Sequence, residues 1–219
     1  MVMEKQRNGQ YLAIVALIIG VVGLSVGFSA FSNVLKIQAS ADVSPDASTF
    51  NVDFSSSQTE VLANEITPVV TPASITATAA VIDNTSVPTI SNLSASFKEP
   101  GQKAVYEFYA FNAGELAAYL KSIVYENVTA SQATKVCTAK EGTTDTLVQK
   151  ACDGISVSVK VGDEAVVTSG KSGITGHELA KGVGEKVVVT IEYQADASRA
   201  DGDFTVKFGD ISLNYSSVD

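Results

Sequence analysis

The chain has 219 residues, of which 45% are hydrophobic, and it carries a formal net charge of -9. That length accommodates one mid-sized domain and a tail, and the apolar content is sufficient for a hydrophobic core. The acidic surface repels nucleic-acid phosphates, so we expect no DNA or RNA partner. A single histidine excludes most His-based metal and triad chemistry, so we expect a protein without a cofactor that is not an enzyme.

An uncharged apolar segment, residues 11–31, follows a short polar start that contains Lys5 and Arg7. A helix of about 20 residues spans the hydrocarbon core of a bilayer. The basic residues hold the amino terminus in the cytoplasm, so the remainder of the chain is exported.

This segment predicts a division of the chain into two domains. Residues 1–32 form a cytoplasmic stub plus a hydrophobic signal or anchor helix, and residues 33–219 form an extracellular domain. The signal-peptide junction is expected at Ala30 and Phe31, although Phe28 is large where a small residue is preferred. Cleavage there and retention as a membrane anchor both remain open.

Apolar and polar residues alternate in most of the remaining chain, which predicts strands with one buried face. The predicted strands lie at residues 34–43, 50–54, 74–83, 103–112, 117–127, 155–161, 186–194, 203–208 and 210–215. In the strand at 74–83 the expected inward face carries Ile75, Ala77, Ala79 and Val81.

Turn-forming Gly, Pro, Asn and Asp residues separate these strands. Eight or nine short strands with little helix predict an all-β protein, an antiparallel β-sandwich or jelly roll preceded by an N-terminal transmembrane or signal helix. The one helical turn expected after that helix lies in "TGHELAKG", with Thr175 as its N-cap and Gly182 at its end.

Cys137 and Cys152 are the only cysteines, and an exported domain meets an oxidising environment. We expect a disulfide between them, with the polar segment that they enclose forming a loop. Free thiols or metal ligands are the alternatives, but two cysteines without a nearby His or a further Cys make a poor zinc site.

Three segments resemble the TasA/camelysin family of secreted biofilm-matrix fibre proteins of Gram-positive bacteria. They are "GFSAFSN" at the end of the apolar segment, "FKEPGQKAVYEFYAFNAGELAAYLKSI" at residues 97–123, and "GVGEKVVVTIEYQ" at residues 182–194. The resemblance implies processing by a dedicated signal peptidase, a location at the cell surface, and assembly into filaments.

The N-terminal strand is the candidate assembly element. After processing near Ala30 its alternating residues are free to complete the sheet of a neighbouring subunit, as donor-strand addition does. Its apolar face consists of Leu35, Ile37, Ala39, Ala41 and Val43. The expected partners are therefore other copies of the chain or matrix components, together with the membrane at least before processing.

Two other functions are alternatives. A surface module that binds a carbohydrate or another ligand could use the exposed aromatic residues Tyr106, Tyr109, Tyr119 and Tyr125. A camelysin-like metallopeptidase is the weakest, because His177 and Glu178 begin an H-E-x-x-H pattern whose second His is Lys181.

Metal binding is not expected elsewhere either. The acidic residues near the early strands (Asp42, Asp46, Asp53) and in the late turns (Asp201, Asp203, Asp210) lack the spacing of a calcium loop. Solvated turns are the simpler interpretation of these carboxylates and of His177.

Overall fold

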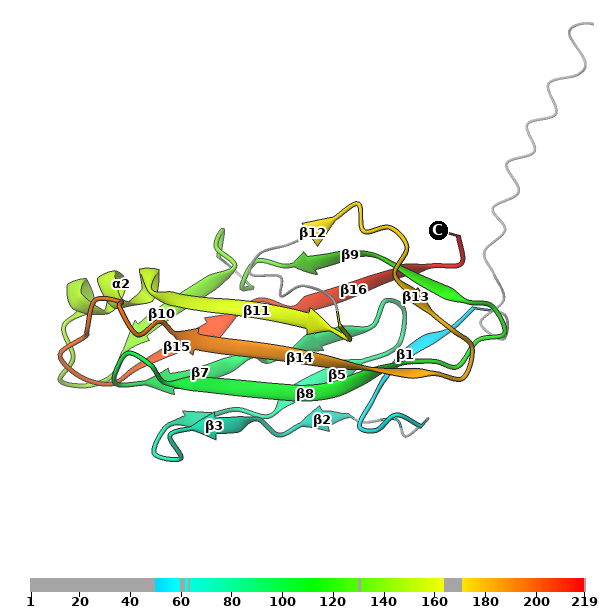
Figure 1. The fold of residues 1–219 in the computed structure, drawn as a ribbon. Helices are drawn as coiled ribbons and strands as arrows, with labels where there is room; N and C mark the ends of the chain where they lie inside the picture. Colours follow the sequence, from blue (N-terminus) through cyan, green and yellow to red (C-terminus); the bar gives the residue numbers. More distant parts are fainter. Residues whose placement is uncertain (1–49, 60–61, 63, 130, 164–170, 219) are drawn as a thin grey trace, which may run out of the picture. The chain divides into compact units, whose positions relative to one another are not determined.

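The computed structural model describes residues 50–59, 62, 64–129, 131–163 and 171–218, which fold into an all-β body (Figure 1). The predicted N-terminal helix and the predicted strand at 34–43 lie outside the described residues. Within those described, no helix is long and apolar enough to cross a membrane.

Every strand pairing in the described chain is antiparallel. The strands are β1 (Val52–Ser55), β2 (Glu65–Ile66), β3 (Val69–Thr71), β4 (Thr76–Ala77), β5 (Ala80–Asp83), β6 (Thr89–Ser91), β7 (Ser94–Phe97), β8 (Lys103–Asn112), β9 (Ala118–Tyr125), β10 (Lys135–Ala139), β11 (Ile155–Val161), β12 (Lys171–Ser172), β13 (Glu178–Leu179), β14 (Gly184–Tyr193), β15 (Phe204–Phe208) and β16 (Ile211–Ser216). One helix, α2 (Asp145–Asp153), lies between β10 and β11.

The first layer of the body is a five-stranded sheet in the order β1–β8–β14–β11, with β3 beside the other end of β8. Its central strands β8 and β14 are ten residues long, and alternate residues of each are buried, as predicted. The buried residues are Ala104, Tyr106, Phe108 and Ala110 on β8, and Val187, Val189, Ile191 and Tyr193 on β14.

The second layer consists of a four-stranded sheet, β10–β15–β7–β4, and a seven-stranded sheet that includes β9–β16–β6–β5–β2. The chain passes from one to the other through short breaks between β4 and β5, β6 and β7, and β15 and β16. At one break Asn92 has a left-handed φ of 59°. At another, a side chain on Gly209 would place its Cβ 2.0 Å from the Glu126 carbonyl oxygen, so only glycine fits.

The break between β4 and β5 overturns the predicted buried face of the strand at 74–83. Ile75 is buried as expected, but Val81 is exposed and Ala80 and Ile82 are buried instead. The strand is interrupted between Ala77 and Ala80, so the alternation restarts with the opposite parity.

Aromatic side chains join the two layers into a β-sandwich. Tyr193 of β14 packs edge-on against Phe204 of β15, with ring centroids 5.5 Å apart, and against Phe97 of β7 at 6.1 Å. The Tyr106 hydroxyl donates a hydrogen bond to the Thr78 carbonyl oxygen of the second layer at 3.1 Å. One core cluster thus contains residues of all three sheets.

Cys137 and Cys152 form a disulfide, as predicted. The segment between them is not only a loop, because it contains α2. Val148, Ala151 and Cys152 are buried at the i, i+3 and i+4 spacing of one helical face, which the polar surroundings obscured. The helix lies against β10 at one end of the sandwich (Figure 1).

Candidate functional site

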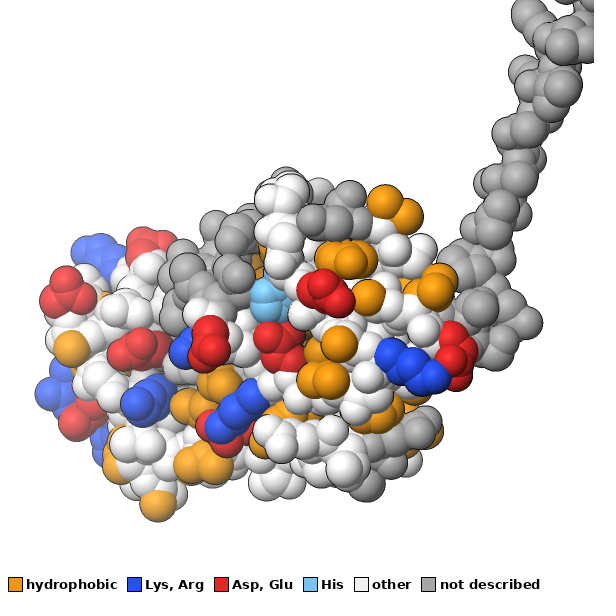
Figure 2. Space-filling view, turned by 45° about the vertical axis from the view of Figure 1, so that its right-hand side comes forward, with side chains coloured by type: hydrophobic (Ala, Val, Ile, Leu, Met, Phe, Trp, Pro, Cys, Tyr) orange, Lys and Arg blue, Asp and Glu red, His pale blue; other side chains and the backbone are white. Residues whose placement is uncertain are grey.

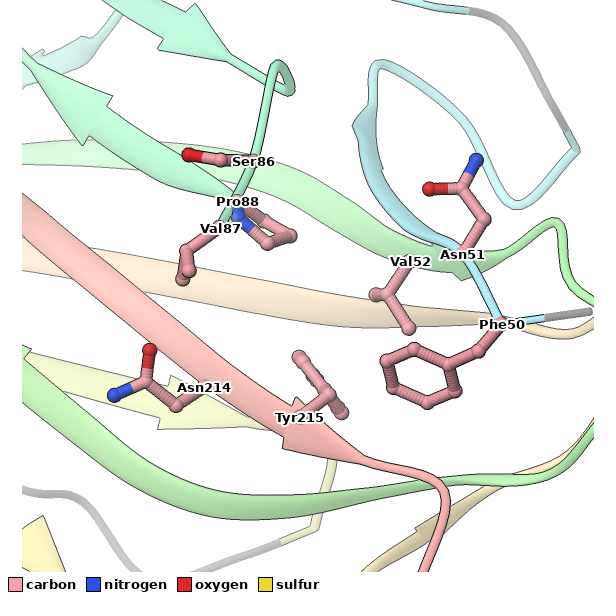
Figure 3. Close-up of a pocket in the computed structure, with 8 residues that line it drawn as sticks. All are labelled: Phe50, Asn51, Val52, Ser86, Val87, Pro88, Asn214 and Tyr215. Atoms are coloured by element: carbon pink, nitrogen blue, oxygen red, sulfur yellow. The ribbon is translucent and has the colours of Figure 1, made fainter. Parts of the chain in front are cut away.

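A small hollow lined by both apolar and polar side chains opens beside β16 (Figure 3). It has a volume of about 100 Å³. Its lining residues come from the start of β1, from the turn between β5 and β6, and from β16: Phe50, Asn51, Val52, Ser86, Val87, Pro88, Asn214 and Tyr215. We call this site the β16 hollow.

The hollow exists because the ladder between β6 and β16 ends early. Its last pair is Ser212 with Thr89, followed by one hydrogen bond from the Leu213 amide to the Pro88 carbonyl oxygen at 3.1 Å. Proline has no amide hydrogen, so it cannot extend the ladder, and the chain turns away.

Beyond this point β16 continues to Ser216, and the described strands pair with it on one side only. Asn214, Tyr215 and Ser216 pair with β9, and the register shifts between Asn214 and Tyr215. On the side of the hollow, no described strand pairs with these three residues. An unpaired strand edge is a template for a further strand.

The Tyr215 side chain connects the hollow to the interior. Its hydroxyl is buried and has no hydrogen-bond partner among the described residues. Burial raises the pKa of this hydroxyl, and the Glu185 carboxylate raises it further. The group therefore stays protonated at neutral pH, and an unpaired buried hydroxyl costs free energy.

His177 is mostly buried, and its neighbours form no helical turn, so the expected solvated side chain and the expected helical turn were both wrong. Its imidazole is only 9% exposed, and its Nε2 atom lies 2.8 Å from Glu185 Oε2. The chain beside it forms β13, which pairs with β9, so it is held extended. The imidazole is visible beside acidic side chains in Figure 2.

No grouping of three His, Cys, Asp or Glu side chains that could hold a metal ion occurs among the residues that the structure describes. Asp53 is buried and accepts a hydrogen bond from Asn51 Nδ2 at 2.7 Å. Asp201 accepts two hydrogen bonds from Thr144, which lower the pKa of its carboxyl group. These two carboxylates therefore serve local structure.

The tyrosines named for carbohydrate binding differ in exposure. Tyr106 is fully buried, so it cannot meet a ligand, and that part of the expectation was wrong. Tyr109, Tyr119 and Tyr125 are half-buried on β8 and β9. The four do not gather into one exposed aromatic surface.

The predicted junction residues Ala30 and Phe31, like the donor-strand residues Leu35 to Val43, lie outside the described residues. The β16 hollow was not predicted. Its sequence signal is modest: Pro88 at a strand start, and Phe50 and Tyr215 at the ends of alternating runs. Only the fold brings these positions together.

The described residues define the chain as an antiparallel β-sandwich with one disulfide-linked helix. Comparison with protein-family models, curated proteins and solved structures gave no match.

Proposed function

We propose that this protein is an exported structural subunit that assembles into extracellular filaments or matrix by strand addition. The strand at residues 34–43 of one copy adds to the free edge of β16 in another. The observation that carries the proposal is the β16 hollow, a cavity of mixed polar and apolar lining beside a strand edge that has no partner among the described strands.

The dimensions of the hollow suit one aliphatic side chain. Its volume of about 100 Å³ is below the ~150 Å³ of a cavity that accommodates benzene. A strand places every second side chain on one face, so Leu35 or Ile37 fills the hollow while Lys36 points to solvent. Main-chain hydrogen bonds to β16 supply affinity, and the filled hollow supplies register.

The proposal includes features that rest on the sequence. They are the N-terminal signal or anchor helix, export to the surface of a Gram-positive-type bacterium, and the jelly-roll form of the sandwich. The disulfide between Cys137 and Cys152 supports export, because such bonds persist in oxidising compartments. The resemblance to the TasA/camelysin family supports filament assembly.

The first experiment compares two substitutions that add the same charge on opposite faces of the donor strand. Full-length protein expressed in a Gram-positive host is purified and examined by negative-stain electron microscopy. We expect Ile37→Asp to abolish filaments, because a carboxylate would replace the aliphatic side chain beside Phe50 and Val87 in the hollow. The matched control Gln38→Asp keeps them. Filaments of normal length from Ile37→Asp would refute strand addition in this register.

The second experiment tests whether the strand passes between copies. One copy carries Ile37→Cys and the other Val87→Cys, and the two are mixed before mild oxidation. We expect a covalent heterodimer from the mixture and none from either variant alone. A chain carrying both substitutions that cross-links only within itself would show a self-complemented monomer and overturn the proposal.

N-terminal sequencing of the protein recovered from cells distinguishes the two forms of the N-terminal helix. A start near Phe31 identifies a released subunit. An intact Met1 identifies a membrane-anchored one, in which the same strand pairs with neighbours at the cell surface.

A further inference from the structure

A second, larger hollow lies on the four-stranded sheet of the second layer, next to the turn between β7 and β8. Its volume is about 260 Å³, and polar groups dominate its wall. The lining residues are Ser74, Ile75, Thr76, Ser96, Phe97, Lys98, Gln102, Lys140 and Asp203. We call this site the lysine hollow.

A row of hydroxyl side chains crosses the sheet into this hollow. The strand register aligns Thr76 with Ser96, Ser96 with Thr205, and Thr205 with Thr138. Neighbouring strands lie about 4.8 Å apart, so the backbones that carry these hydroxyl groups repeat at about that interval. The Ser96 Oγ and Thr205 Oγ1 atoms are 3.0 Å apart and share a hydrogen bond. The row can both donate and accept further hydrogen bonds.

The charges at the lysine hollow oppose those of the whole chain. Lys98 and Lys140 contribute two ammonium groups and Asp203 one carboxylate, in a protein with a net charge of -9. Among the described residues none of these three side chains forms an ion pair. Two unpaired cations beside hydroxyl groups favour an anionic, hydroxylated ligand.

The backbone around the hollow is held in place before any ligand binds. The buried Gln102 side chain accepts hydrogen bonds through Oε1 from the amides of Lys98 and Glu99, at 2.7 and 3.1 Å. The Lys140 amide donates to the Asp203 carbonyl oxygen at 3.1 Å. Ligand binding therefore costs little conformational entropy of this backbone.

We propose that the lysine hollow binds an acidic sugar residue of an extracellular polysaccharide. The carboxylate lies between Lys98 and Lys140, and the ring hydroxyls bond to Thr76, Ser96 and Asp203. The volume falls just below the ~300 Å³ at the lower end of ligand pockets, so it suits one sugar ring. The chain has no Trp, and the lining Phe97 is only 1% exposed, so recognition depends on charge and hydroxyl groups rather than on stacking.

This inference is independent of filament assembly, because no residue lines both hollows. A subunit with both sites would cross-link a filament to the polysaccharide around it. Failure of one proposal leaves the other standing.

The test is isothermal titration calorimetry of the full chain in mild detergent, with trigalacturonate as the probe. Its fully methyl-esterified form is the control ligand, because it keeps the ring hydroxyls and loses the charge. We expect binding of trigalacturonate that weakens at higher ionic strength, and at least about tenfold weaker binding of the ester.

Two matched variants locate the site. Lys98→Gln combined with Lys140→Gln is expected to weaken trigalacturonate binding about tenfold or more. Lys150→Gln combined with Lys160→Gln removes the same charge from exposed positions on α2 and β11, and should leave the affinity unchanged. Circular dichroism confirms that both variants remain folded.

Three results would overturn the proposal. They are no binding of trigalacturonate at millimolar concentration, equal binding of its ester, and equal losses in the two double variants. Tighter binding of poly(glycerol phosphate) than of trigalacturonate would identify a phosphate site instead, and would also overturn it.

Discussion

Two strand edges in the second layer differ in whether another described segment covers them. The edge of β10 is covered by α2: Cys137 is bonded to Cys152 of the helix, and Gln149 Nε2 donates to the Cys137 carbonyl oxygen at 3.4 Å. Lys135 Nζ also donates to the Cys152 carbonyl oxygen at 2.7 Å. The edge of β16 beside its hollow has no described strand partner.

Aromatic side chains are also more deeply buried near the β10 edge than near the β16 edge. Near the closed edge, Phe97, Tyr193 and Phe204 are fully buried in mutual contact. Near the β16 edge, Phe50 is only half-buried, and the Tyr215 hydroxyl lacks a partner among the described residues. Natural sheets usually protect their edges, and the proposed strand addition would cover this one.

The largest expected effect is at the closed end. Phe204→Ala removes a buried ring and should lower the free energy of unfolding by about 4 kcal/mol, measured by denaturant titration. Phe50→Ala is the comparison and should cost at most about 1 kcal/mol, because this ring already contacts solvent. Filament formation, by contrast, should be impaired more by Phe50→Ala than by Phe204→Ala. Equal destabilisation by the two variants would contradict the expected difference in packing between the β10 edge and the β16 edge.

The second prediction removes the cross-link of the closed edge. Replacing Cys137 and Cys152 together with Ala should lower the free energy of unfolding by about 3 kcal/mol, because the bond closes a loop with a sequence separation of 15. Chemical denaturation measures this loss. A double variant as stable as the parent would show that α2 holds the edge without the disulfide.

The third prediction concerns a polar contact that fixes the loops beyond β8. Asn112 is fully buried; its Nδ2 donates to the Leu116 and Leu179 carbonyl oxygens, and its Oδ1 accepts from the Gly114 amide. Asn112→Ala should cost about 2 kcal/mol, because these groups lose their partner in the interior. The exposed Asn92 bond to Ala79 offers a milder control in Asn92→Gly.

The smallest effect is expected at the open edge. Tyr215→Phe removes a buried hydroxyl that has no partner among the described residues, so the free energy of unfolding should stay unchanged or rise by up to about 1 kcal/mol. Thermal denaturation at neutral pH measures the change. A clear loss of stability would show that the hydroxyl is bonded in solution.

Alkaline unfolding provides a further test of Tyr215. Burial raises the pKa values of Tyr106, to about 12, and of Tyr215, whereas unfolded tyrosines titrate near about pH 10. Above about pH 10 the unfolded chain has released protons that the native chain retains, so the free energy of unfolding falls as pH rises. Tyr215→Phe should make this fall shallower, and a return to pH 8 should restore the signal.

The alternating strands could be predicted because each run carries its own signal. In β11, β14 and β15 the inward residues are those that the period of two selects. The prediction failed where a neighbouring segment decides the conformation. The break between β4 and β5 reverses the buried face, and α2 hides its apolar stripe in a polar stretch.

The candidate sites, too, could be predicted only where the signal is local in the sequence. The disulfide could be predicted because the chain contains only two cysteines and begins with an apolar segment that predicts export. The hollows could not, because their walls come from segments far apart in sequence, such as Phe50 with Tyr215 and Lys98 with Lys140. His177 was expected in solvent, but the fold places it against Glu185, and its side chain is only 9% exposed.

By itself the sequence determined an all-β protein with defined inward faces and one disulfide, because strand alternation and cysteine chemistry are local properties. Only the tertiary structure decided which of the two strand edges another described segment covers. That outcome depends on where separate strands begin and end against one another: β6 begins only at Thr89, after Pro88, while β16 continues to Ser216.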